Sequence, residues 1–310
     1  MDDGLHHVPP HAPEHPVLDR IVEALRSQRA VPDATWEQRR FAMKAAQAKL
    51  RMPEGVAIDK LRVAGRKAAW IRAAEADAVP RDGCVLYLHG GGYALGSVVT
   101  HKELMARLSA AAGVPVLGLD YRLAPENPFP AAVDDAHAAV RWLFAQGVEP
   151  RRLVIAGDSA GGGLTMATAL RLRDAGDPLP GGLALLSPWT DLTASGTSHT
   201  TRADRDPMVS LEGLQLMARA YAQGRTRDEL ASPLFAELEG LPPVYAQVGD
   251  AEILLDDATR LHERLEAAGV RSRLEVWERM LHVFQAFPQL PEAAQAVDQL
   301  GAWIRFRLGG

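Results

Sequence analysis

The regular alternation of short apolar segments with longer helical ones constrains the fold more than any other feature of this sequence. Eight short runs rich in apolar and β-branched residues predict strands, and helical periodicity separates them from the third run onward. Runs such as 116–119 and 183–186 are apolar throughout, which is typical of parallel strands buried on both faces. The alternation predicts an α/β fold with a mainly parallel eight-stranded sheet and helices on both faces.

The first two predicted strands differ from the others, because only Ala64-Gly65-Arg66 separates them. So short a connection joins antiparallel strands, and we expect a hairpin there. The predicted strands span 56–63, 67–73, 83–89, 114–119, 152–157, 182–187, 243–248 and 273–277. The predicted helices of the alternation span 101–112, 132–146, 161–175, 253–268 and 291–307.

Two parts of the chain lie outside the alternation. Residues 1–16 hold four histidines and four prolines, and we expect an ill-ordered lead-in there rather than a metal site, because frequent proline is typical of a loose terminus. Helical spacing follows from Val17 to Leu25 and again from Thr35 to Leu50. The interval 191–230 is too long for an ordinary loop and has a helical pattern of its own, as binding lids often do.

Composition excludes several classes of protein. The chain has 310 residues, 47% of them hydrophobic and 24% charged, which fits one large α/β domain or two small ones. A domain of this size needs no disulfide or metal to stay folded. The formal net charge of −5 leaves no broad basic surface for nucleic acid. The sequence shows neither a signal peptide nor an apolar run of roughly 18 residues, which predicts a cytoplasmic protein without a membrane span. The single cysteine, Cys84, is expected to be a small buried hydrophobe.

A glycine-flanked serine is the strongest candidate for chemistry. Gly157-Asp158-Ser159-Ala160-Gly161 is a G-x-S-x-G pattern between the predicted strand 152–157 and a predicted helix. A serine at a strand-to-helix corner occupies a strained turn that exposes its hydroxyl above the sheet, and small neighbours let the backbone pass. The alternative is a glycine-rich turn with an incidental serine, which this context disfavours. The pattern indicates a nucleophile at Ser159.

A second glycine-rich segment, His89-Gly90-Gly91-Gly92-Tyr93, follows the predicted strand 83–89. Successive glycines leave backbone N–H groups unobstructed, as a developing oxyanion requires. The N–H of Ala160, directly after the candidate nucleophile, would complete an oxyanion hole. A phosphate cradle is the alternative, but no Lys-Ser/Thr pair follows and the spacing is not G-x-G-x-x-G.

Taken together, these segments resemble the bacterial hormone-sensitive-lipase-like esterases. The resemblance rests on HGGGYALGS (89–97), DYRLAPENPFPAA (120–132), GDSAGGG (157–163), ASPLFAELEGLPP (231–243) and LHVFQAF (281–287). It implies an α/β-hydrolase fold with a helical cap and a carboxylic-ester hydrolase that uses a Ser-His-acid triad and no cofactor. It also implies that Gly91 and Gly92 donate to the oxyanion.

The resemblance also divides the chain into domains. Residues 1–50 match the N-terminal cap helices and 191–225 the cap insertion, while 51–190 and 226–310 match the catalytic domain.

The triad base is expected at His282, just past the predicted strand 273–277, because triad members follow in the order serine, acid, histidine. From a loop at that place a histidine can reach the serine hydroxyl and act first as base and then as acid. His89 is expected to brace the oxyanion turn. The other histidines of the folded region fall on predicted helices or in the insertion: His101, His137, His262 and His199.

The triad acid follows from the resemblance, and here the sequence departs from the family pattern. The family shows Asp-Pro-Leu-x-Asp-Glu, and without gaps its first aspartate falls on Glu252, with Ile253 in place of proline. Glu252 is therefore the expected acid and Asp250 the alternative. Asp256 is expected to be an N-cap or part of a structural pair. A structural role is also expected for four other charged residues: Asp120, Arg122, Glu126 and Asp158.

The expected substrates are short- to medium-chain esters, because cap helices that shelter a cleft disfavour aggregated lipid. Apolar and bulky cap residues support this expectation: Trp36, Phe41, Met43, Leu211, Leu214 and Met217. A lactone hydrolase with the same triad is the nearest alternative. A hydrolase-like protein that only binds a ligand would have lost a catalytic residue, yet Ser159 and His282 are both present. The expected partner is a small-molecule ester, and a homodimer is left open.

Overall fold

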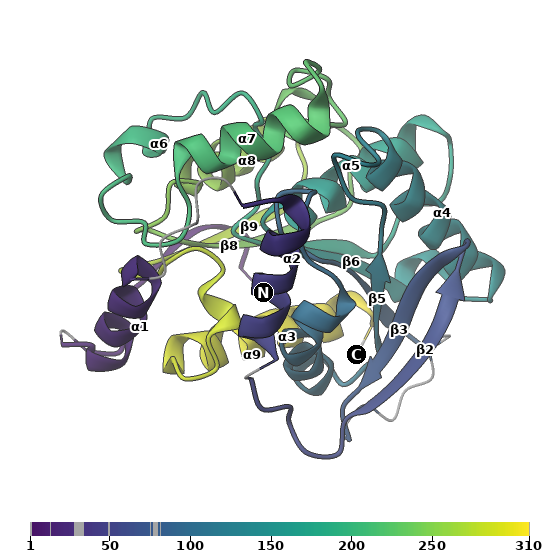
Figure 1. The fold of residues 1–310 in the computed structure, drawn as a ribbon. Coiled ribbons are helices and arrows are strands. Elements are labelled where there is room, and N and C mark those ends of the chain that lie inside the picture. Colours follow the sequence, from purple (N-terminus) through teal and green to yellow (C-terminus); the bar gives the residue numbers. More distant parts are fainter. Residues whose placement is uncertain are drawn as a thin grey trace.

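The computed structural model describes residues 2–12, 14–27, 34–48, 50–74, 76, 80 and 82–309. A single nine-stranded sheet runs through the molecule in the order β1-β9-β8-β7-β6-β4-β5-β3-β2, with helices on both faces (Figure 1). The strands are β1 Gly4–Val8, β2 Ala57–Val63, β3 Arg66–Arg72, β4 Cys84–Leu88, β5 Val116–Asp120, β6 Leu153–Asp158, β7 Gly182–Leu186, β8 Val244–Gly249 and β9 Ser272–Trp277. The helices are α1 Pro16–Ser27, α2 Trp36–Gln47, α3 Val98–Ala112, α4 Ala131–Ala145, α5 Ala160–Asp174, α6 Ser198–Thr201, α7 Leu211–Ala222, α8 Leu255–Ala267 and α9 Pro291–Arg307.

Strand direction agrees with the expectation from the sequence. The neighbouring pairs from β1 through β9, β8, β7, β6 and β4 to β5 are all parallel. β2 and β3 form the antiparallel hairpin predicted around Ala64-Gly65, and β3 pairs antiparallel with β5. The predicted α/β fold with a mainly parallel sheet is confirmed.

The number of strands was predicted wrongly, because the sheet has nine and not eight. The additional strand is β1, Gly4–Val8, which pairs in parallel with β9 along the sheet edge, so the expectation of an ill-ordered lead-in was wrong for this segment. An edge strand held by backbone hydrogen bonds on one side needs no long apolar run. Farther on, His15 Nε2 lies 2.9 Å from Glu292 Oε2, which ties the segment to α9.

The side chains of the sheet divide between two apolar cores, as strand geometry requires. In β4, Val85 and Tyr87 pack with α3 and α9 on one face. Leu86 and Leu88 pack with α4, α5 and α8 on the opposite face. Both faces of the central strands are therefore buried, which explains why these segments are apolar throughout.

The two parts of the chain that were assigned to a cap hold helices α1, α2, α6 and α7. α2 packs beside α3, and α7 lies above the strands in the view of Figure 1. The domain boundaries drawn from the resemblance stay a prediction. In the described ranges, no helix combines the length and the apolar character that a membrane crossing needs.

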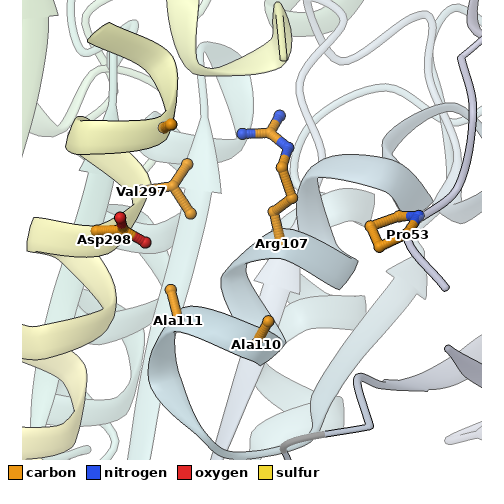
Figure 2. Close-up of a pocket in the computed structure, with 7 residues that line it drawn as sticks. Pro53, Arg107, Ala110, Ala111, Val297 and Asp298 are labelled. Carbon is orange, nitrogen blue, oxygen red and sulfur yellow. The ribbon is translucent and has the colours of Figure 1, made fainter. Parts of the chain in front are cut away.

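A hollow of about 320 Å³ lies between α3 and α9, away from every residue that the sequence nominated for chemistry (Figure 2). Its lining is Pro53, Arg107, Ala110, Ala111, Ala294, Val297 and Asp298. The guanidinium of Arg107 is held by Glu103 and by the carbonyl of Gln285. We regard this hollow as a feature of helix packing.

We predict that Gly301→Ala destabilises the protein by about 1–3 kcal/mol, because α3 and α9 touch at this glycine. A Cβ on Gly301 would lie 2.4 Å from the backbone carbonyl carbon of Ala111, so the helices would have to separate. Gly213 in α7 is the matched control, since a Cβ there meets only Ser210 Oγ at 3.3 Å. Gly213→Ala should leave stability unchanged or raise it by up to about 1 kcal/mol. Urea denaturation measures the unfolding free energy of both variants. An equal change in that free energy in the two variants would contradict the prediction.

Candidate active site

Ser159 occupies a strained corner between β6 and α5. Its φ and ψ are 53° and −122°, a conformation that side chains other than glycine rarely adopt. The corner is held because the Ser159 N–H donates to Leu186 O at 2.8 Å and Ser159 O accepts from Trp189 N at 2.9 Å. A Cβ on Gly161 would lie 1.9 Å from Leu88 O, so only glycine fits there. The predicted strand–turn–helix setting of this serine is confirmed.

A carboxylate and a histidine meet at the same sheet edge, after β8 and β9. Glu252 Oε2 lies 2.6 Å from His282 Nδ1, and both side chains are buried. Glu252 Oε1 accepts from the backbone N–H of Gly249 at 2.7 Å. Both carboxylate oxygens therefore have partners, which orients the imidazole and leaves Nε2 as its remaining nitrogen.

The charge of Glu252 changes the acidity of its partner. Burial by itself lowers the pKa of His282, but the Glu252 carboxylate and its hydrogen bond outweigh burial, so the pKa is raised above the ordinary value of 6.5. Asp206 and Asp158 act in the same direction. His282 is thus a stronger base than a free imidazole.

Ser187 was missed by the sequence reasoning. Its hydroxyl donates to Glu252 Oε1 at 2.7 Å and accepts from the Val283 N–H at 2.9 Å, so one buried side chain holds both the acid and the loop that carries His282. Its φ of +46° is a second left-handed conformation at this edge. The signal in the sequence was its position directly after β7, next to the strand that precedes Ser159.

The alternative acid, Asp250, has other partners. Its carboxylate lies 3.0 Å from Arg205 Nη2 and accepts from the Arg279 N–H at 2.6 Å. The structure brings Glu252, and not Asp250, into contact with His282.

Asp256 is not the N-cap of α8, so that part of the expectation was wrong. α8 begins at Leu255, and Asp256 already lies in its first turn. The Asp256 carboxylate instead accepts from Thr197 Oγ1 at 2.8 Å and from Ser198 N at 3.0 Å, which matches the structural pairing given as the other option. The next residue, Asp257, accepts from the N–H groups of Thr190 and Asp191.

The glycine turn after β4 presents backbone N–H groups. Gly91 and Gly92 have φ values of +112° and +60°. A Cβ on Gly92 would lie 1.8 Å from Met217 Sδ, so α7 lies directly over this turn. Among the described residues no hydrogen bond uses the N–H of Gly91 or Gly92, nor that of Ala160 in the first turn of α5.

The turn rests on a buried polar layer. His89 Nδ1 lies 2.8 Å from Gly90 O, and His89 O accepts from Tyr121 Oη at 2.6 Å, as a bracing role requires. Burial lowers the pKa of His89 to about 3, so this ring is neutral. Asp158 accepts from the Gly90 N–H at 3.0 Å, and His101 approaches the same carboxylate. His101 was set aside as a helix residue, yet it lies in this layer.

The charged stretch after β5 connects loops to helices. Asp120 accepts from the Val98 N–H at 2.7 Å. Arg122 pairs with Asp135 at 2.8 Å. Glu126 pairs with Arg40 of α2, which also donates to Ala94 O at 2.8 Å and so anchors that helix to the loop after the glycine turn. These contacts agree with a structural role.

The remaining candidates have local partners. His137 pairs with Asp177, His262 with Ser272 and His199 with Asp257. Cys84 is buried, and burial raises its pKa to about 12, so it is no nucleophile. In the part of the chain that the structure describes, no group of three or more His, Cys, Asp or Glu side chains is arranged to hold a metal ion.

Known proteins share both the fold and the length of this chain. Residues 85–286 match the α/β-hydrolase fold family. An acetyl-hydrolase of Streptomyces hygroscopicus is 43% identical over 299 residues, which cover 95% of this chain and 98% of that protein. EstE5 soaked with p-nitrophenyl butyrate is 40% identical, with a TM-score of 0.91 over 96% of this chain and 100% of EstE5.

A solved esterase from the bacterial hormone-sensitive lipase family is 45% identical, with a TM-score of 0.92 over 96% of this chain and 100% of that one. The chain therefore belongs to the α/β-hydrolase family, among the bacterial hormone-sensitive-lipase-like esterases.

Proposed function

We propose that this ester hydrolase cleaves short- to medium-chain carboxylic esters through an acyl-enzyme on Ser159, with His282 as base and Glu252 as the orienting acid. The observation that carries the proposal is the 2.6 Å hydrogen bond between Glu252 and His282, at the sheet edge where Ser159 is strained. A chain of hydrogen bonds connects the segments that carry Ser159, Glu252 and His282. Ser159 N donates to Leu186 O, and the next residue, Ser187, contacts Glu252 and the residue after His282.

In the first step, the Ser159 hydroxyl attacks the ester carbonyl carbon while its proton passes to His282. Glu252 stabilises the resulting imidazolium through Nδ1. The oxyanion of the tetrahedral intermediate accepts hydrogen bonds from the backbone N–H groups of Gly91, Gly92 and Ala160. His282 then gives the proton to the leaving alcohol.

Because the base must be neutral and its pKa is raised, turnover increases with pH through a midpoint above 6.5.

In the second step, water attacks the acyl-enzyme with His282 again as base, and the carboxylic acid leaves as Ser159 recovers its proton. Apart from the ester and water, every group in this proposed cycle belongs to the chain, so the mechanism calls for no cofactor.

Two observations support ester substrates with small acyl groups. α7 closes over the oxyanion turn, since the side chain of Met217 fills the space that a Cβ on Gly92 would need. The Streptomyces relative is named an acetyl-hydrolase, and a butyrate ester was used with EstE5. Lactone opening would use the same residues, and nothing among the described residues favours it over ester hydrolysis. A cytoplasmic location and a homodimer stay predictions.

We predict that Ser159→Ala abolishes hydrolysis of p-nitrophenyl butyrate without unfolding the chain, because no other side chain replaces the nucleophile. A sulfonyl fluoride should modify the wild-type protein once, at Ser159, as peptide mass spectrometry would show. Full activity in the variant, or a label on another serine, would refute the proposed mechanism.

We expect Glu252→Gln to reduce kcat by about 10³- to 10⁴-fold, because the amide keeps the size of the side chain but removes the charge that stabilises the imidazolium. Asp250→Asn is the matched control and should change kcat by less than about threefold, since Asp250 pairs with Arg205 instead. Both variants are compared at equal folded fraction. The opposite ranking would move the acid to Asp250 and leave Ser159 and His282 in their proposed roles.

We expect Ser187→Ala to lower kcat by about 10- to 100-fold, because Glu252 and the His282 loop lose their shared hydroxyl. Ser109→Ala is the control, since Ser109 is equally buried, donates to Val114 O and accepts from Ala73 N. Each variant should lose about 1–3 kcal/mol of unfolding free energy. Only Ser187→Ala should lose turnover. An equal loss of kcat in both variants would show a general effect of destabilisation.

A further inference from the structure

A buried ion pair lies beneath the oxyanion turn, and the proposed mechanism does not use it. His101 Nε2 of α3 lies 3.3 Å from Asp158 Oδ2 at the end of β6, and the two side chains are only 8% and 5% exposed. Burying two charges costs desolvation free energy that their attraction often fails to recover. This pair is therefore weak evidence for stability and calls for a different explanation.

Asp158 connects the oxyanion turn to the nucleophile. Its Oδ1 accepts from the Gly90 N–H at 3.0 Å and from Tyr87 Oη at 2.8 Å, and the next residue in the chain is Ser159. The turn is packed tightly against this carboxylate, because a Cβ on Gly90 would lie 2.2 Å from Asp158 Oδ2. The position of Asp158 thus determines where the glycine turn begins relative to Ser159.

The acceptors around His101 favour a proton on each ring nitrogen. Nδ1 lies 3.2 Å from Ser97 O, a carbonyl that only accepts. Nδ1 also lies 2.8 Å from Thr100 Oγ1, whose own proton is donated to Ser97 O, so this hydroxyl accepts from the ring as well. Nε2 faces the Asp158 carboxylate, another acceptor. The geometry is that of an imidazolium.

We propose that His101 is a positioning residue for ester hydrolysis: as an imidazolium it holds Asp158, and through Asp158 it holds Gly90, so that the next two N–H groups of the turn meet the oxyanion. This inference rests on the proposed function of the turn. His101 touches neither the substrate nor Ser159 in this role. It acts on the transition state only through the position of the turn.

The pKa shifts of His101 and Asp158 agree with a charged pair. Burial lowers the pKa of His101, but Asp158 and the Ser97 carbonyl outweigh burial and raise it above 6.5. Burial raises the pKa of Asp158, but His101 and the donors around it lower that pKa to about 2. The neighbouring ring of His89, stacked at 5.5 Å, is neutral. The other titratable or charged groups near the pair come from several elements. They are Tyr87 on β4, Asp120 at the end of β5, Tyr121 just after β5, Arg107 on α3, and His282, whose pKa Asp158 raises.

The first test compares His101→Gln with His262→Gln, using p-nitrophenyl butyrate. His262 is the matched control because it is also a buried helix histidine with a serine partner, in α8. We expect His101→Gln to lower kcat by about 10- to 100-fold, which is no more than the loss of one oxyanion donor costs. KM should change by less than about threefold. The control should stay within about twofold of wild type. Equal kcat in the two variants would overturn the proposal.

The pH profile tests the charge. In wild type, kcat should fall again on the alkaline side as His101 loses its proton, because a neutral ring no longer attracts Asp158. That alkaline decrease should be missing in His101→Gln, while the rise due to His282 remains. An alkaline decrease of the same size in both proteins would contradict the assignment.

A spectroscopic measurement needs neither activity nor a folded His101 variant. In Ser159→Ala labelled with ¹⁵N-histidine, both ring nitrogens of His101 should show imidazolium shifts at pH 7. A neutral His101 ring at that pH overturns the proposal even if Ser159 and His282 perform as proposed. An imidazolium at His101, together with a wild-type chain that hydrolyses no ester, would instead refute only the proposed function.

Discussion

Parallel pairing among β4, β6, β7, β8 and β9 fixes where every proposed catalytic group of this protein lies. Parallel strands end at the same edge of a sheet, so the loops after these strands meet there although they are far apart in the chain. The glycine turn follows β4 and Ser159 follows β6. Ser187, Glu252 and His282 follow β7, β8 and β9. Both faces of the sheet are covered by helices, which leaves this edge as the place for chemistry.

Two buried acid–histidine pairs serve the same edge in different ways. Glu252 holds His282, whose remaining nitrogen is available for proton transfer in the proposed mechanism. Asp158 holds His101, whose nitrogens both face acceptors, so its proton stays in place. Both pairs consist of a carboxylate and a histidine. The surroundings decide which histidine exchanges a proton and which one provides a fixed charge.

The errors of the sequence interpretation have physical causes. β1 was missed because an edge strand is held by backbone hydrogen bonds, which any residue can make. Asp256 resembles an N-cap in the sequence because it stands near a helix start, but its hydrogen-bond partners come from the segment around Ser198. Ser187 and His101 were missed because serine and histidine are common, and their importance lies in contacts with residues distant in the chain.

The fold class, the strained corner at Ser159 and the glycine turn can be read from the amino-acid sequence, because they depend on local features: apolar periodicity, and glycines where a side chain would clash. The identity of the carboxylate that contacts His282 depends instead on contacts between segments that are distant in the chain. Asp250 and Glu252 lie two residues apart on one turn, and the local sequence suits either. The choice is made by Gly249 N and Ser187 Oγ, which hold one Glu252 oxygen and leave the other 2.6 Å from the imidazole, while Asp250 turns to Arg205.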